Sequence, residues 1–124
     1  MLDSAKLTGF LFTLDYDRAR EFFVHKLGCE FVDQNPFALV VSVGGNQIRI
    51  SRIPDFVPAK GTVLGWEVKN INACVDWLTQ QGVALENYPF IQDQERGIWT
   101  TPDGSKVAWF KDPDGNILSI SEHS

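Results

Sequence analysis

The alternation of apolar and polar positions in the first half of the chain predicts one helix among four strands. Asp15 supplies a capping side chain, apolar residues then recur at helical spacing, and Gly28 ends that segment. Because glycine tolerates positive φ, Gly44-Gly45-Asn46 predicts a hairpin turn. The predicted elements are strands at 6–14, 30–33 and 37–43, a helix between 15 and 28, and a strand around 48–50.

The second half repeats this order after a connector at 54–60 that holds two prolines. Asn70 begins a helix with apolar residues at helical spacing, and Gly82 ends it. Pro102-Asp103-Gly104 predicts a second hairpin, and the segment 112–116 predicts a tight turn. The predicted elements are strands at 63–68, 84–88, 98–101, 106–110 and 117–121, with the helix between 70 and 82.

The sequence contains an internal duplication, because the segment 45–51 (GNQIRIS) resembles the segment 115–121 (GNILSIS). The chain therefore predicts an α+β fold of two tandem β-α-β-β-β modules, at about 5–54 and 61–122. A module of roughly 55 residues is too small to be stable alone, so we expect both to form a single domain, 1–124. A duplicated mixed sheet of this kind curls, and its concave face is a natural ligand cleft.

Composition and charge exclude several classes of function for this chain. The 124 residues include 16 acidic and 11 basic side chains, for a net charge of −5, which argues against nucleic-acid binding. No apolar run is long enough to span a bilayer, and the N-terminus does not resemble a secretory signal, so we expect a cytoplasmic protein. Cys29 and Cys74 lie far apart without a Cys-x-x-Cys pair, which argues against a zinc ribbon or a thioredoxin-type site.

Three segments carry a resemblance to a known family: the run 107–116 (VAWFKDPDGN), the helix pattern at 15–28, and the opening of the second module at 66–71 (WEVKNI). Together with the two modules, they resemble the vicinal oxygen chelate superfamily over almost the whole chain. That superfamily includes glyoxalase I, extradiol dioxygenases, fosfomycin-modifying enzymes and bleomycin resistance proteins. The resemblance is specific for the fold, while one scaffold of this kind hosts many chemistries.

The resemblance also implies where a metal would bind, since the enzymes of this superfamily generally hold a divalent ion with His and Glu from four strands. These positions fall at Thr8, Arg49, Val63 and Ser119. None of the four is a good ligand for a divalent cation, and Arg49 would place a positive charge in its site. We therefore expect no metal and no cofactor.

Strand alternation predicts which side chains face the cleft. If Arg49 and Ser119 face it, Ile48, Ile50, Leu118 and Ile120 pack under the helices. The predicted ligand-binding residues are Thr8, Phe10, Phe12, Arg49, Val63, Glu67, Trp99, Trp109 and Ser119. Alternatives stay open: Arg49 and Glu67 suit an ion pair or a dimer seam, and the aromatic residues suit core or dimer packing.

Two hypotheses of function follow. The first is a metal-free protein that binds or sequesters a small organic molecule, like the bleomycin resistance proteins, and the resemblance implies a homodimer. The second is a glyoxalase-like lyase, isomerase or dioxygenase, with Glu67 as a base, Arg49 as an oxyanion partner, or Glu95 as an acid or base. A metal-dependent version would need ligands such as Glu67, Glu95 or Glu122. A protein-association module is a third interpretation, and neither histidine is expected beside a reactive serine.

Overall fold

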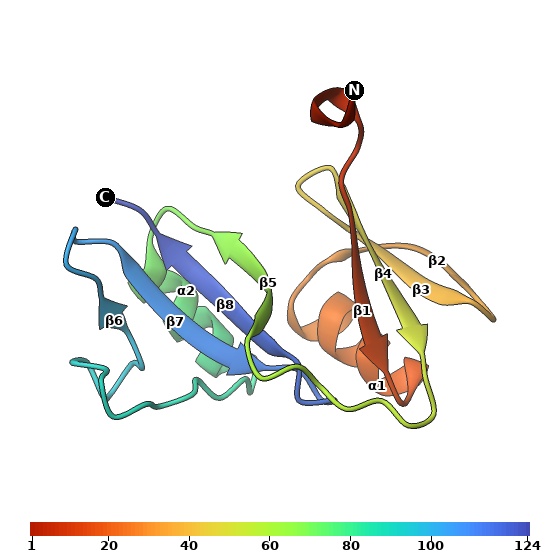
Figure 1. Cartoon of the computed structure of the whole chain (residues 1–124). Helices are drawn as coiled ribbons and strands as arrows, with labels where there is room; N and C mark the ends of the chain where they lie inside the picture. The colour runs from red at the N-terminus through yellow and green to blue at the C-terminus, as the bar shows by residue number, and fades with distance from the viewer. The chain divides into compact units, whose positions relative to one another are not determined.

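The computed structural model describes residues 1–124 and contains two compact units, Met1–Pro58 (unit 1) and Ala59–Ser124 (unit 2). Figure 1 shows unit 1 in red to yellow and unit 2 in green to blue. Each unit contains one β-α-β-β-β module, so each predicted module falls within one unit. That the two modules form a single domain with a ligand cleft stays a prediction.

Unit 1 is a four-stranded mixed sheet covered by one helical segment. Its strand order is β1-β4-β3-β2, with β1 and β4 parallel and the other pairs antiparallel. The Asp15 carboxylate accepts the N–H of Asp17 at 2.8 Å and so begins the helix. The elements are a 3₁₀ turn at Leu2–Ser4, β1 (Thr8–Thr13), α1 (Tyr16–Arg20), a π-helical continuation at Glu21–Lys26, β2 (Glu30–Asn35), β3 (Ala38–Val43) and β4 (Asn46–Arg52).

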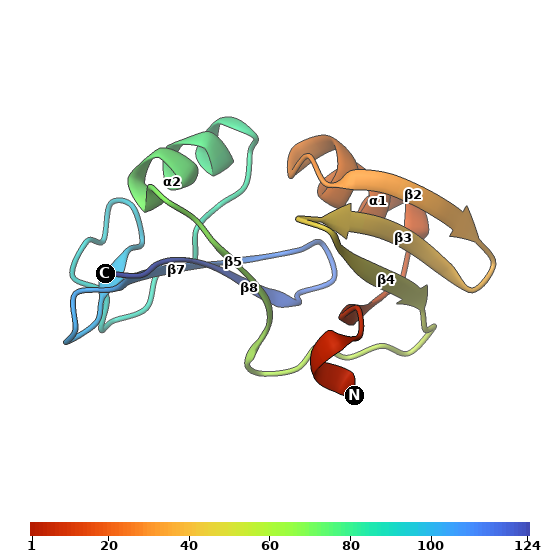
Figure 2. The same cartoon turned by 90° about the horizontal axis from the view of Figure 1, so that it is seen from above.

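Unit 2 repeats this topology with the strand order β5-β8-β7-β6, in which β5 and β8 are parallel. The elements are β5 (Thr62–Glu67), α2 (Ile71–Gln80), β6 (Trp99–Thr100), β7 (Lys106–Lys111) and β8 (Ile117–Glu122). Figure 2 shows α2 lying along one face of the strands of its own unit. The predicted α+β fold of two duplicated modules is therefore confirmed.

One predicted element is wrong, because residues 84–88 do not form a strand. Leu85 makes a single bridge to Phe110 of β7, and the N–H of Glu86 donates to the carbonyl of Trp109 at 2.7 Å. Pro89 follows soon after and has no N–H to continue such a ladder. The chain instead forms a long loop at 83–98 that returns to the edge of the sheet at β6.

The predicted division of side chains between the two faces of each sheet is confirmed. Ile48, Ile50, Leu118 and Ile120 are all buried, on the face that the helices cover. Opposite them, Phe10 lies beside Arg49 in the β1–β4 register, and Ser119 lies beside Trp109 in the β7–β8 register. No helix in the structure is long and apolar enough to cross a membrane.

Candidate functional site

The strand face of unit 2 that α2 leaves uncovered brings together two of the predicted site residues. Ser119 of β8 pairs with Trp109 of β7 on one side and with Gly65 of β5 on the other. A Cβ atom at position 65 would lie 2.7 Å from the Ser119 hydroxyl oxygen. Glycine at this position therefore leaves room for the hydroxyl over β5, next to the Trp109 ring.

Four aromatic rings gather on this face, and we call Tyr88, Phe90, Trp99 and Trp109 the ring cluster. Trp99 and Trp109 are stacked with their ring centroids 6.1 Å apart, and Tyr88 and Phe90 are stacked at 5.6 Å. The two stacked pairs meet edge to face, since Phe90 is tilted by 80° to Trp99 and by 86° to Trp109. Such edge-to-face contacts fit the quadrupoles of the rings and stabilise the corner that they form.

The ring cluster keeps aromatic surface available to a ligand. Phe90 is 55% exposed, and Tyr88, Trp99 and Trp109 are half-buried. Sequence reasoning found the two tryptophans but missed Tyr88 and Phe90, because it placed residues 84–88 in a strand. The available signal was the pair of aromatic residues on either side of Pro89 within a polar segment. The cluster exists because the loop at 83–98 folds back over β6 and β7.

The predicted residues of unit 1 share the exposed face of its sheet. Thr8, Phe10 and Phe12 lie on β1 beside Gln47, Arg49 and Ser51 of β4, in that order. Phe10 is 63% exposed, whereas Phe12 is half-buried and packs on Phe56 with ring centroids 5.8 Å apart. The half-buried Arg49 supplies a guanidinium beside an exposed ring, which suits an anionic or carbonyl group next to an apolar one.

Val63 and Glu67 are the remaining predicted ligand-binding residues, and both lie on β5. Thr62 pairs with Ile117 and Leu64 with Leu118, so Val63 falls at a shift in the register. Glu67 is exposed and pairs with Ser121 of β8.

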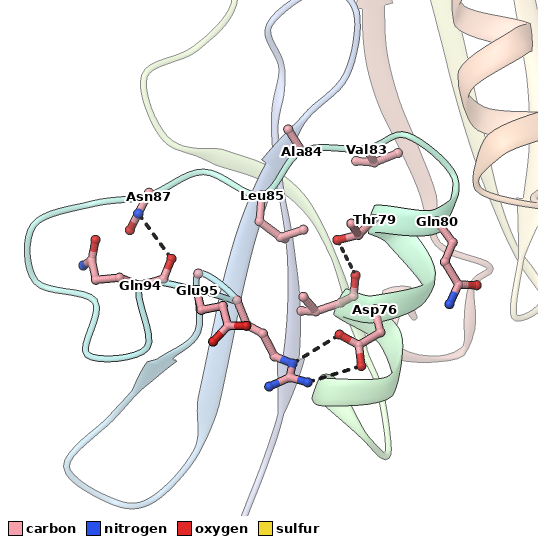
Figure 3. A pocket seen from close by; sticks show the side chains of 12 residues that line it. Asp76, Thr79, Gln80, Val83, Ala84, Leu85, Asn87, Gln94 and Glu95 are labelled. Carbon is pink, nitrogen blue, oxygen red and sulfur yellow. Dashed lines mark hydrogen bonds and ion pairs between the residues drawn. The ribbon is translucent and has the colours of Figure 1, made fainter.

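The carboxylates named as candidate acids, bases or metal ligands lie in different surroundings. Glu95 lines a cavity between α2 and the loop that follows it (Figure 3). None of the four residues of the ring cluster lines that cavity. Glu122 is engaged elsewhere, because its carboxylate accepts the N–H of Ile71 at 2.9 Å, at the start of α2. Within unit 2, therefore, Glu67, Glu95 and Glu122 do not converge on one point.

The residues at the family's metal positions do not fit a divalent ion. They supply the hydroxyls of Thr8 and Ser119, the Arg49 guanidinium and the Val63 isopropyl group. Within either unit, no group of three or more His, Cys, Asp and Glu side chains lies close enough to share an ion. A hydroxyl, a guanidinium and an alkyl group are each poor substitutes for the hydration shell of a divalent cation.

One serine does lie beside a histidine, at Ser121 and His123. The Ser121 hydroxyl oxygen lies 3.2 Å from Nε2 of His123, two residues later on the exposed end of the chain. No carboxylate hydrogen-bonds the imidazole to orient it. The pair therefore lacks the third member that activates a serine nucleophile.

The turn between β7 and β8 sets the positions of Trp109 and Ser119. Asp112 is 6% exposed and accepts three hydrogen bonds: from the N–H of Asp114, the N–H of Asn116 and the side-chain amide of Asn116. Burial raises the pKa of Asp112 above its usual value, and these hydrogen bonds act in the opposite direction. Asp112 thus joins the two strands that carry the candidate site.

Comparisons with known proteins agree with this architecture. Residues 6–120 match the family model of the Glyoxalase/Bleomycin resistance protein/Dioxygenase superfamily. A glyoxalase family protein from Bacillus anthracis is 20% identical with a TM-score of 0.76, over 98% of this chain and 96% of that one. A superfamily member from Sphaerobacter thermophilus is 22% identical with a TM-score of 0.75, over 99% and 100%. A lactoylglutathione lyase from Agrobacterium tumefaciens is 20% identical with a TM-score of 0.70, over 96% and 93%. No curated protein matches the chain.

Proposed function

Because the chain belongs to the Glyoxalase/Bleomycin resistance protein/Dioxygenase superfamily, we propose that it binds and sequesters a small organic molecule without using a metal ion. The ring cluster is the observation that carries this proposal. Its two stacked pairs form a corner with Phe90 55% exposed, which suits a flat aromatic or conjugated ligand. The Ser119 hydroxyl beside Trp109 adds a hydrogen-bonding group that orients such a ligand.

The absence of a fitting donor set supports the metal-free part of the proposal. Thr8, Arg49, Val63 and Ser119 stand where the family's enzymes place metal ligands, and the Arg49 cation would repel an ion there. Within unit 2, the Ser119 hydroxyl beside Trp109 instead hydrogen-bonds carbonyl and carboxylate oxygens directly. We therefore expect a ligand that combines a flat apolar part with an oxygen-bearing group.

Ligand binding is tested with Trp99→Leu and the matched control Trp77→Leu. Trp77 lies on α2, is 39% exposed and is not part of the ring cluster. A thermal-shift screen of flat aromatic acids and carbonyl compounds supplies ligands, and calorimetry measures their Kd in each variant. Loss of one stacking partner costs about 1 kcal/mol, or about fivefold in Kd, in Trp99→Leu alone. Equal weakening in both variants, or no ligand in the screen, would contradict the proposal.

Metal content separates binding from the enzymatic alternative. The purified chain is incubated with Mn²⁺, Ni²⁺, Zn²⁺ or Fe²⁺, dialysed and analysed for bound metal. We expect far less than one ion per chain, because the donor set does not fit. About one tightly held ion per chain would instead favour a glyoxalase-like lyase, isomerase or dioxygenase. Glu67, Glu95 and Glu122 would then be the first residues to replace.

We also propose that the chain forms a homodimer. Unit 1 exposes several large apolar side chains, including Leu7 at 74% and Phe37 at 80%. Exposed apolar surface of this kind is stabilised when a second copy covers it. Light scattering coupled to size-exclusion chromatography gives the mass in solution, and a monomer at all concentrations would contradict this expectation.

A further inference from the structure

Unit 2 holds a cavity that the proposed function does not use. It has a volume of about 540 Å³ and lies between α2 and the loop at 83–97, and we call it the helix–loop pocket. Figure 3 shows Asp76 and Thr79 on α2 at one side of the pocket, with Leu85, Asn87, Gln94 and Glu95 on the loop side. A volume of this size is in the range of sites for small organic molecules.

The helix–loop pocket presents both signs of charge at its edge. Nε of Arg96 lies 3.2 Å from a carboxylate oxygen of Asp76, an ion pair that joins the loop to α2 across the pocket. The Asp76 carboxylate raises the pKa of Arg96, so the guanidinium stays charged. Their side chains are 53% and 41% exposed, respectively, and an ion pair in such contact with water contributes little to stability.

This weak ion pair is therefore easily replaced by a ligand that carries both charges. A carboxylate can bind the guanidinium of Arg96 through two parallel hydrogen bonds. An ammonium group can then bind the released carboxylate of Asp76. Glu95, which makes no hydrogen bond of its own within the chain, lies close enough to Arg96 to interact with its charge and adds a second carboxylate.

The floor and the loop of the helix–loop pocket favour a ligand with a compact apolar part. Val75 is 2% exposed and Val83 5% exposed, so the inner wall is aliphatic. The loop is held in place by its own hydrogen bonds: Asn87 donates to the carbonyl of Gln94, and the Gln94 amide donates to the carbonyl of Tyr88. A wall fixed in this way does not have to become ordered on binding.

We propose that the helix–loop pocket binds a free α-amino acid with an aliphatic side chain. The Arg96 guanidinium binds the carboxylate, Asp76 and Glu95 bind the ammonium group, and the valine-lined floor receives the side chain. The site is separate from the ring cluster, although both use the loop at 83–98.

Calorimetry on the full chain tests this proposal with L-valine, L-isoleucine and L-leucine as probes. Two analogues of L-leucine isolate its charges, because isocaproate lacks the ammonium group and isoamylamine lacks the carboxylate. We expect at least one of the amino acids to bind with a Kd of about 1 mM or tighter, and each analogue to bind about tenfold more weakly than L-leucine. No binding by any of the three amino acids, or equal binding by the analogues, would overturn the proposal.

Substitutions in the pocket then test which side chains bind the amino-acid ligand. Arg96→Gln and Asp76→Asn should each weaken binding about tenfold, since each removes one charge partner. Lys111→Gln is the matched control, because it breaks another ion pair of unit 2, Lys111–Glu86 at 3.3 Å, whose residues do not line the pocket. Thermal unfolding confirms that each variant is folded. An unchanged Kd in Arg96→Gln, or an equal loss in Lys111→Gln, would refute the assignment.

Discussion

Replacing Asp112 with alanine should destabilise unit 2 strongly, because the carboxylate satisfies buried donors at the β7–β8 turn. It accepts the N–H and the side-chain amide of Asn116 at 2.9 and 2.7 Å, and the N–H of Asp114 at 2.9 Å. Asn116 is only 2% exposed, so water cannot replace the two carboxylate oxygens that its N–H and side-chain amide would lose without a rearrangement. Each unsatisfied buried donor costs about 1–3 kcal/mol, and relief of the buried charge offsets part of this. We therefore expect a loss of about 3 kcal/mol in the free energy of unfolding.

Urea unfolding followed by tryptophan fluorescence is the assay, because all four tryptophans lie in unit 2. Asp112→Asn is the matched variant: it keeps one oxygen to accept the two main-chain N–H groups and should lose about 1 kcal/mol. A loss below about 1 kcal/mol in Asp112→Ala, or an equal loss in both variants, would refute the reasoning that these hydrogen bonds hold the turn.

The pH dependence of the same variants tests the effect of burial on Asp112. Its pKa is raised in the folded state, chiefly by desolvation, so the folded chain binds this proton more tightly than the unfolded chain does. The resulting stabilisation is complete below the unfolded pKa of about 3.9 and is lost as pH rises through the folded value. The stability difference between the wild type and Asp112→Asn should therefore favour the wild type more at acidic pH than at neutral pH. A difference that does not change with pH would contradict this assignment.

Three further predictions concern unit 2 and the two thiols. Gly97→Ala should lower the free energy of unfolding by about 2 kcal/mol, because φ is +70° and the new Cβ would lie 3.0 Å from a main-chain carbonyl oxygen. Gly82→Ala, with φ at +81° but open space around the new Cβ, should lower it by about 1 kcal/mol. Urea unfolding compares the two variants, and equal losses would contradict the steric argument. Glu122→Ala should cost about 1 kcal/mol, since it removes an acceptor for the first N–H of α2, and an unchanged midpoint in urea would contradict this role. Burial raises the pKa of both thiols, and Cys29 is the more buried of the two. A disulfide reagent should therefore modify Cys29 more slowly than Cys74. The Cys29→Ser and Cys74→Ser variants assign the two rates, and faster reaction of Cys29 would overturn this order.

The duplicated fold could be predicted from sequence because its signals are local. Buried apolar residues alternate with polar ones in both strands, Ile48 and Ile50 in β4 and Leu118 and Ile120 in β8. The glycines at 44, 45 and 82 stand where positive φ is needed. The same alternation placed Arg49 and Ser119 on the faces that the helices leave uncovered. A period of two residues requires this division wherever one face of a strand is buried.

The loop at 83–98 shows where this reasoning failed. Its aromatic and apolar residues resembled a strand at 84–88, yet within those five residues only Leu85 forms a bridge. Tyr88 and Phe90 instead pack on the two tryptophans. From this loop, sequence reasoning named only Glu95, as a candidate acid, base or metal ligand. The structure places Arg96 against Asp76, twenty residues away on α2.

The sequence by itself therefore determined the order of the elements, the duplication and the faces of the strands, since each depends on neighbouring residues. Only the tertiary structure decided that four rings form one corner and that an ion pair spans a cavity beside α2. Both features join segments far apart in the chain, and such pairings are set by where a loop can bury apolar surface and satisfy its main-chain groups. The two-residue period of strands and the 3.6-residue period of helices do not predict these pairings, because the pairings depend on how the whole chain packs.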